Sequence, residues 1–208
     1  MPYSRSAPSP RYTDLLALYR DMHANGDVTS GLPPEMTFNG ISLRPHVNRI
    51  RALIRDSGAK TLLDYGCGKA LGYLGATVTL ANNAGQATLQ QFWELDEIAL
   101  YDPAVADHDT LPERTFDAAI STDVLEHCPE EDIDWILGDI FGHARLFVFC
   151  TVALFPASKR LPTGGNAHVT LKTADWWHSR FEAAKKVHRV PYVLTLMHDH
   201  DRSEEVAG

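Results

Sequence analysis

Apolar residues recur at two spacings along this chain of 208 residues, and each spacing predicts a different element. Over residues 13–26 and 44–60 they repeat every three to four positions, which is the spacing of one helix face. We therefore predict two helices, the first capped by Thr13 and ended by Gly26. The buried face of the second is expected to carry Val47, Ile50, Leu53 and Ile54.

Four shorter runs are apolar almost throughout, which is typical of strands buried on both faces of a parallel sheet. They begin at Thr61, Glu97, Phe116 and Ala144. Because helical and strand patterns alternate, we predict an α/β fold in which helices cover both faces of a mostly parallel sheet. A chain of this length, 44% apolar, needs only one globular unit.

The first of these strands runs into a turn rich in glycine, TLLDYGCGKALG at residues 61–72. Gly66 and Gly68 remove the Cβ atoms that would keep a ligand from the backbone, so the turn predicts a cofactor site. A P-loop is excluded, because its spacing is absent and Ala70 follows Lys69 where Ser or Thr is needed. A nicotinamide dinucleotide stays open as an alternative, although the glycines follow GxGxxxG rather than GxGxxG.

Asp64 stands two residues before the first glycine, and this DxGxG arrangement resembles motif I of the class I S-adenosylmethionine-dependent methyltransferases. Further motifs of that family follow in the same order, and the resemblance covers roughly residues 50–195. They are an acid ending the second strand (Asp102), LP at 111–112, FD at 116–117, LEH at 125–127 and a histidine (His168) after the fifth strand. The ordered set is more specific than any single motif.

The resemblance implies a Rossmann-like, doubly wound, mostly parallel sheet in three layers, with S-adenosyl-L-methionine as the cofactor. Residues 46–208 would form the methyltransferase domain. Residues 1–45, a helix and a loop, would either close over the substrate as a lid or only cover the sheet. The acid that ends the second strand would accept both ribose hydroxyls of the cofactor. The cofactor-binding residues that the resemblance implies are Asp64, Gly66, Cys67, Gly68, Asp102 and Asp123.

Two intervals depart from the family pattern. Only eight residues, PAVADHDT, separate Asp102 from LP. We therefore predict that the third strand and the helix before it are missing or reduced, which leaves the second strand at the sheet edge. The adenine would then be bound by Asp107 or Asp109, with Leu111. The preceding interval is long instead, and it must hold an insertion and the first crossover helix, best placed at 85–95.

Methyl transfer from an activated donor requires alignment, exclusion of water and, for a hydroxyl or amine acceptor, removal of one proton. Asp123, His127 and His168 are the candidate catalytic residues, because they follow the fourth and fifth strands, where ligands bind in such sheets. Each histidine has an alternative role in packing or in fixing a loop. Asp123, Glu126 and His127 also offer ligands for a divalent cation. An acid cluster at a helix start is the simpler interpretation, and we expect no metal.

Two further groups have an ordinary structural interpretation beside a functional one. The run HDHD near residue 200 offers metal ligands, but we expect a solvated tail there. Four large aromatic side chains either line an acceptor pocket or belong to the core and surface of helices. They are Trp135, Trp176, Trp177 and Phe181.

The charge, the cysteine content and the apolar runs limit which partners and which compartment we expect for this chain. A formal net charge of −8 argues against nucleic acid, whose affinity comes largely from Lys and Arg on phosphates. Cys67, Cys128 and Cys150 are too scattered for a disulfide framework, and no apolar run approaches the ~18 residues of a membrane span. We expect a cytoplasmic monomer or homodimer that methylates a small-molecule hydroxyl or amine and binds no membrane. The alternatives are a nicotinamide-dependent oxidoreductase and a non-catalytic S-adenosylmethionine-binding or scaffold domain.

Overall fold

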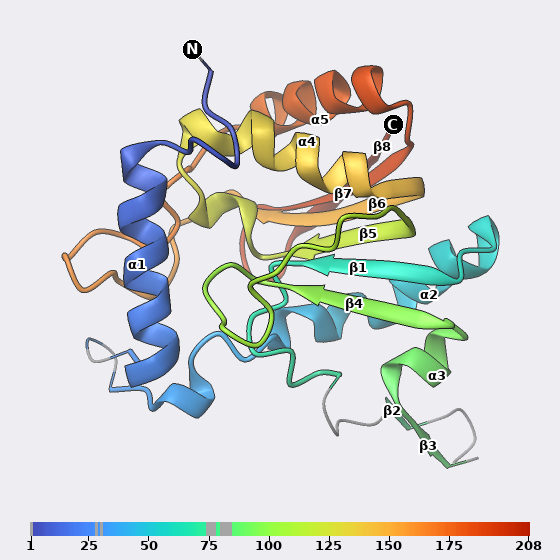
Figure 1. The fold of residues 1–208 in the computed structure, drawn as a ribbon, viewed down its shortest axis with the longest axis horizontal. Coiled ribbons are helices and arrows are strands. Elements are labelled where there is room, and N and C mark those ends of the chain that lie inside the picture. The colour runs from blue at the N-terminus through green and yellow to red at the C-terminus, as the bar shows by residue number, and fades with distance from the viewer. Residues whose placement is uncertain (1, 28, 30, 74–77, 80–84) are drawn as a thin grey trace.

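The computed structural model describes residues 2–27, 29, 31–73, 78–79 and 85–208, and its centre is one six-stranded sheet. The strand order is β4-β1-β5-β6-β7-β8, and every neighbouring pair is parallel except β7 and β8 (Figure 1). The strands are β1 (Thr61–Tyr65), β4 (Glu97–Tyr101), β5 (Phe116–Thr122), β6 (Ala144–Ala153), β7 (Tyr192–Met197) and β8 (Ser203–Ala207). A separate antiparallel pair joins β2 (Val78–Thr79) to β3 (Gln86–Ala87).

Helices cover both faces of the sheet, which makes the predicted three layers (Figure 1). On one face lie α4 (Ile133–His143) and α5 (Ala174–His188), and on the other lie α2 (Val47–Ser57) and α3 (Leu89–Trp93). The remaining helix, α1 (Pro10–Asn25), stands beyond the carboxyl ends of β1 and β4. The predicted α/β class and the Rossmann-like arrangement of a mostly parallel sheet are therefore confirmed.

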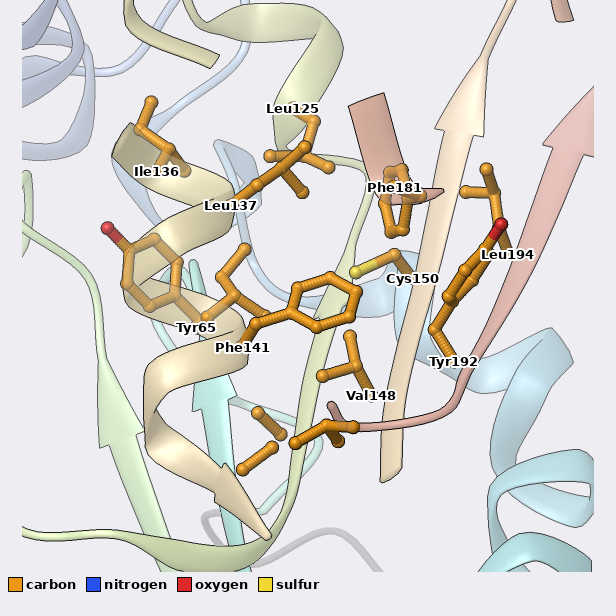
Figure 2. Close-up of a cluster of buried hydrophobic side chains, with 14 of the residues drawn as sticks. Tyr65, Leu125, Ile136, Leu137, Phe141, Val148, Cys150, Phe181, Tyr192 and Leu194 are labelled. Carbon is orange, nitrogen blue, oxygen red and sulfur yellow. The ribbon is translucent and has the colours of Figure 1, made fainter. Parts of the chain in front are cut away.

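The core beneath α4 and α5 is built around aromatic rings. Figure 2 shows Phe141 of α4 lying among Val148, Cys150 and Phe181. The ring of Phe141 is 5.9 Å from that of Phe181 and 6.0 Å from that of Tyr192, both at edge-to-face angles. All five side chains are essentially fully buried, and each contributes about 1.5–3 kcal/mol by leaving water.

The opposite face is closed by α2, as its apolar spacing predicts. Val47, Ile50 and Ile54 are buried, and Leu53 packs against the same cluster from a partly buried position. The indole N–H of Trp93 in α3 donates to the carbonyl of Val47 at 2.9 Å. This bond satisfies a polar atom that would otherwise be costly inside the core.

The intervals before and after β4 are the two that depart from the family pattern. The strand β4 lies at the sheet edge, and residues 102–115 form a loop with no third strand, as predicted. The crossover helix predicted at 85–95 is shorter, since α3 spans only five residues. Thr88 caps its start in a capping box with Gln91, and Glu94, in the left-handed conformation, ends it. The inserted part contains the β2–β3 pair; its residues 74–77 and 80–84 lie outside the described residues.

Two helix starts differ from the prediction. The helix α1 begins at Pro10, not at Thr13, because the hydroxyl of Ser9 accepts from the backbone of Tyr12 at 3.0 Å and proline suits the first helical position. The helix α2 begins at Val47, because the preceding segment Ile41–His46 forms a 3₁₀ turn. Among the described residues, none of the helices combines the length and the apolar character needed to cross a bilayer.

Candidate functional site

A cavity of about 450 Å³ opens at the carboxyl ends of the parallel strands. Its wall contains Gly66 and Gly68 after β1, Asp102 after β4 and Asp123 after β5. The helix α1 closes it with apolar and aromatic side chains. Such clefts are where open α/β sheets bind ligands, and the volume is within the range of small-molecule sites.

The register of β1 and β4 explains why the glycine turn meets the acid of the neighbouring strand. Tyr65 pairs with Tyr101, and both strands end at this pair, so Gly66 and Asp102 follow at the same edge. The carboxylate of Asp102 accepts the backbone N–H of Gly68 at 2.9 Å through one oxygen. Its other oxygen accepts the N–H of Ala104, also at 2.9 Å. Burial raises the pKa of Asp102, and these two donors oppose the shift.

Glycine is required at both positions of the turn. Gly66 has φ +88° and Gly68 has φ +56°, a region that side chains rarely adopt. A Cβ on Gly68 would lie 2.5 Å from the carbonyl oxygen of Phe38. The turn therefore presents bare backbone to the cavity on one side and supports the N-terminal segment on the other.

Asp64 and Cys67, two of the predicted cofactor residues, are buried, and neither is among the residues that line the cavity. The carboxylate of Asp64 accepts the hydroxyl of Tyr73 at 2.8 Å, and its second oxygen is buried without a hydrogen-bond partner in the described structure. Burial raises the pKa of Asp64 to about 7. Burial also raises the pKa of the Cys67 thiol. Their contact with a cofactor stays a prediction.

The three candidate catalytic residues come together on the cavity wall. Thr122 of β5 is in register with Thr151 of β6, and the next residue, Asp123, donates its N–H to the Thr151 hydroxyl at 3.0 Å. The rings of His127 and His168 are 4.8 Å apart, edge to face. A carboxylate oxygen of Asp123 lies 4.0 Å from Nε2 of His168.

Hydrogen bonds fix the orientation of both imidazoles. Nδ1 of His127 lies 2.9 Å from the carbonyl oxygen of Ala167, and Nδ1 of His168 lies 2.6 Å from that of Phe155. Because a carbonyl only accepts, each Nδ1 carries a hydrogen, so in the neutral form of each ring the lone pair is on Nε2. The pKa of His127 is lowered to about 4, chiefly by burial and also by the neighbouring His168, while Asp123 opposes the shift.

Glu126 does not belong to this group. Its side chain is fully buried, and its carboxylate accepts the backbone N–H of Ala153. Burial and the neighbouring Asp123 raise its pKa. The helix expected to start here is a short 3₁₀ helix at residues 125–127 with Glu126 in its first turn, and the α-helix α4 begins only at Ile133, after Pro129.

No family model, curated protein or solved structure matches this chain. The resemblance to methyltransferases therefore rests on the ordered motifs. The structure adds a Rossmann-like sheet and places Gly66, Gly68, Asp102, His127 and His168 on the wall of one cavity, whereas the LP and FD motifs contribute no residue to that wall.

Several other predicted positions lie away from the cavity. Asp107 and Asp109 are exposed, and Leu111 packs into the core, so Pro103 and Ala104 form the wall beside Asp102 instead. The predicted acceptor aromatics are not among the lining residues. Trp177 and Phe181 are core residues, Trp176 stacks under Arg180, and Trp135 donates its indole N–H to Asp132.

The HDHD run is not a tail. It forms the turn between β7 and β8, and this turn places His200 4.9 Å from Phe155, ring to ring, at the cavity wall. The antiparallel return of β8 brings the turn to this position. The apolar pattern gave no signal for β8, because its side chains are almost all exposed.

The sequence analysis left open whether residues 1–45 cover the substrate or only the sheet, and it named none of the α1 residues that line the cavity. The hydroxyl of Tyr19 donates to the carbonyl of Ala167 at 3.2 Å and lies 3.2 Å from Nδ1 of His127. Lys69, next to the glycine turn, donates through Nζ to the carbonyls of His23 at 2.9 Å, Thr37 at 3.3 Å and Pro34. The Lys69 ammonium thus attaches α1 and the segment after it to the cofactor turn.

Replacing Lys69 with methionine is expected to loosen residues 10–40. The apolar stem keeps its packing, but three carbonyls lose a charged donor, which costs about 1–2 kcal/mol. Hydrogen exchange measured by mass spectrometry should rise in this segment and not in β5 and β6. Lys186→Met, on the exposed side of α5, is the matched control. Equal protection of residues 10–40 in both variants would contradict the role of Lys69.

Proposed function

We propose that the chain transfers a methyl group from S-adenosyl-L-methionine to a hydroxyl or amine of a small molecule. The observation that carries the proposal is the direct bond between the glycine turn and the edge-strand acid, Gly68 N–H to Asp102, inside one cavity. The phosphate-binding residues of a P-loop are missing. An acid beside bare backbone suits a ribose and the methionine part of the cofactor that is attached to the ribose.

The residues present fit this cofactor. The carboxylate of Asp102 lines the cavity and uses one backbone donor on each oxygen, so each oxygen keeps a lone pair for a ribose hydroxyl. The bare backbone at Gly66 and Gly68 gives room for the part of the cofactor that follows the ribose. The buried, unpartnered oxygen of Asp64 is a further acceptor. When bound, the cofactor supplies a methyl group that is already activated.

The protein's own part is alignment, exclusion of water and removal of one proton. Apolar side chains of α1, including Leu15, Leu16 and Tyr19, cover the cavity and limit water. Nε2 of His127 and Nε2 of His168 carry the lone pairs that could take the proton of the acceptor, and Asp123 stabilises a protonated imidazole. Asp123, His127 and His168 line the same cavity as the glycine turn, so the acceptor would bind between them.

Two other functions use the same fold. A nicotinamide-dependent oxidoreductase would also place a ribose on Asp102, and it predicts binding of NADH. A non-catalytic domain would bind S-adenosylmethionine without turnover, and methyl transfer to any natural acceptor would exclude it.

Asp102→Asn is expected to weaken S-adenosylmethionine binding by about 10- to 100-fold. The amide replaces one acceptor oxygen by a donor, and a hydrogen bond to a charged group is worth about 1.5–3 kcal/mol. Calorimetric titration with S-adenosylhomocysteine measures the loss without turnover. Asp96→Asn, an exposed acid just before β4, is the matched control and should bind as the unmodified chain does. Unchanged affinity in a folded Asp102→Asn protein would remove the ribose assignment.

A further inference from the structure

Three side chains on the cavity wall bring metal-ligand atoms together from separate parts of the chain. One ligand atom each from Asp123, His127 and His168 lies within 4.8 Å of the other two. Asp123 follows β5, His127 belongs to a 3₁₀ turn and His168 lies in the loop between β6 and α5. The expected metal set contained Glu126 instead, and the structure points that side chain to the end of β6.

We propose that Asp123, His127 and His168 bind a divalent first-row transition-metal ion of the Zn²⁺ or Mn²⁺ type. Both imidazoles are oriented for it, because each uses Nδ1 on a backbone carbonyl, 2.9 Å from Ala167 and 2.6 Å from Phe155, which leaves Nε2 for the ion. This outer hydrogen bond is the usual partner of a metal-bound histidine, since it fixes the tautomer and the ring orientation.

The backbone of Asp123 supports the same interpretation. It has φ +62°, which is uncommon for a residue other than glycine, and its N–H is held by Thr151 at 3.0 Å. Strain of this kind persists where the surroundings impose it, and it concentrates at binding sites. Here the strained residue carries the one anionic ligand of the set, and its side chain is 38% exposed and lines the cavity.

The ligand types select the class of ion. Two imidazole nitrogens and one carboxylate suit Zn²⁺, Mn²⁺, Fe²⁺ and Co²⁺, whereas Mg²⁺ and Ca²⁺ prefer oxygen alone. An ion about 2.0–2.1 Å from each ligand holds tetrahedral ligand atoms about 3.3 Å apart, so these ligand atoms, now within 4.8 Å of one another, approach by up to about 1.5 Å on binding. Three protein ligands leave a coordination position that opens to the cavity.

That open position suits an oxygen of the acceptor. The bound ion would favour loss of the proton from this oxygen, a role that the histidines would have if no ion were bound. This role rests on the proposed methyl transfer, whereas binding of the ion does not. A chain that binds the ion but no S-adenosylmethionine would therefore keep the metal site and lose the methyltransferase function.

The test is a Co²⁺ titration of the full chain after treatment with EDTA, followed by visible absorption, with Zn²⁺ used to displace the bound ion. We expect one equivalent of Co²⁺ and little competition from a hundredfold excess of Mg²⁺. Asp123→Asn and His168→Gln should each weaken binding at least tenfold. Asp123→Asn is nearly isosteric and leaves the backbone bond to Thr151 in place, so this variant is expected to fold, which circular dichroism verifies.

His198→Gln is the control, because His198 lies in the β7–β8 turn, pairs with Glu204 and is the alternative place for an adventitious ion. It should bind as tightly as the unmodified chain. The proposal is overturned if the unmodified chain takes up no Co²⁺ or Zn²⁺. It is also overturned if uptake is lost in His198→Gln and kept in folded Asp123→Asn.

Discussion

At pH 8, Asp64→Asn is expected to raise the free energy of unfolding by about 4 kcal/mol relative to the unmodified chain. Burial raises the pKa of Asp64 from its ordinary value near 4 to about 7, so the folded protein holds a proton there that the unfolded chain releases. Folded stability therefore falls as the pH rises from about 4 to about 7. Asparagine carries no charge and still accepts the Tyr73 hydroxyl.

The measurement is urea unfolding of both proteins at pH 5 and pH 8. The gain should be large at pH 8 and much smaller at pH 5, where Asp64 is mostly neutral already. Asp96→Asn, whose side chain is exposed, should follow the unmodified chain at both values. If the free energy of unfolding of Asp64→Asn exceeds that of the unmodified chain by the same amount at pH 5 and pH 8, the Asp64 carboxyl ionises at little cost in the folded protein, which would contradict the raised pKa.

Gly68→Ala should cost about 2–4 kcal/mol of stability and abolish detectable S-adenosylmethionine binding. The new Cβ would lie 2.5 Å from the carbonyl oxygen of Phe38, a backbone atom that cannot rotate away, and φ is +56°. Strained backbone and overpacking each cost about 1–3 kcal/mol. Relief of the clash has to move Gly68 or the segment at Phe38, and either movement disturbs the bond from Gly68 N–H to Asp102.

Gly138→Ala is the matched control for this variant. Gly138 lies in α4 with nothing within 4 Å of an added Cβ, so alanine should stabilise the helix by about 0.5–1 kcal/mol and leave cofactor binding unchanged. Thermal unfolding and calorimetry report the two effects separately. A Gly68→Ala protein with full stability and full affinity would show that the turn does not need the bare backbone.

The fold could be predicted from the sequence where its signals are local. Apolar runs marked four of the parallel strands, β1, β4, β5 and β6, but β7 was not predicted. The face of α2 followed from the spacing of its apolar residues. The count of residues after Asp102 was enough to place β4 at the sheet edge, because eight residues cannot hold a crossover helix and a strand. The start of α1 was missed although Ser9 followed by Pro10 is a strong start signal.

The rest depends on tertiary contacts that no local pattern contains. The strand β8 is polar and exposed, and it is held by pairing with β7 and by the bidentate contact of Arg49 with Glu205. Likewise, the sequence marked His127 and His168 as candidates, but not which nitrogen each ring presents. That depends on the carbonyls of Ala167 and Phe155, which the fold places beside the rings.

The most direct test of the central claim is a parallel calorimetric titration of the purified chain with S-adenosylmethionine, S-adenosylhomocysteine and NADH. We expect the first two to bind with one equivalent each, because Asp102 and the glycine turn line one cavity in the arrangement that a cofactor ribose needs. We expect NADH not to bind, because the glycines follow GxGxxxG rather than the GxGxxG of dinucleotide sites. Binding of NADH without binding of the two sulfur compounds would contradict the methyltransferase proposal and favour the oxidoreductase. Binding of none of the three would mean that the cavity is not a nucleotide cofactor site.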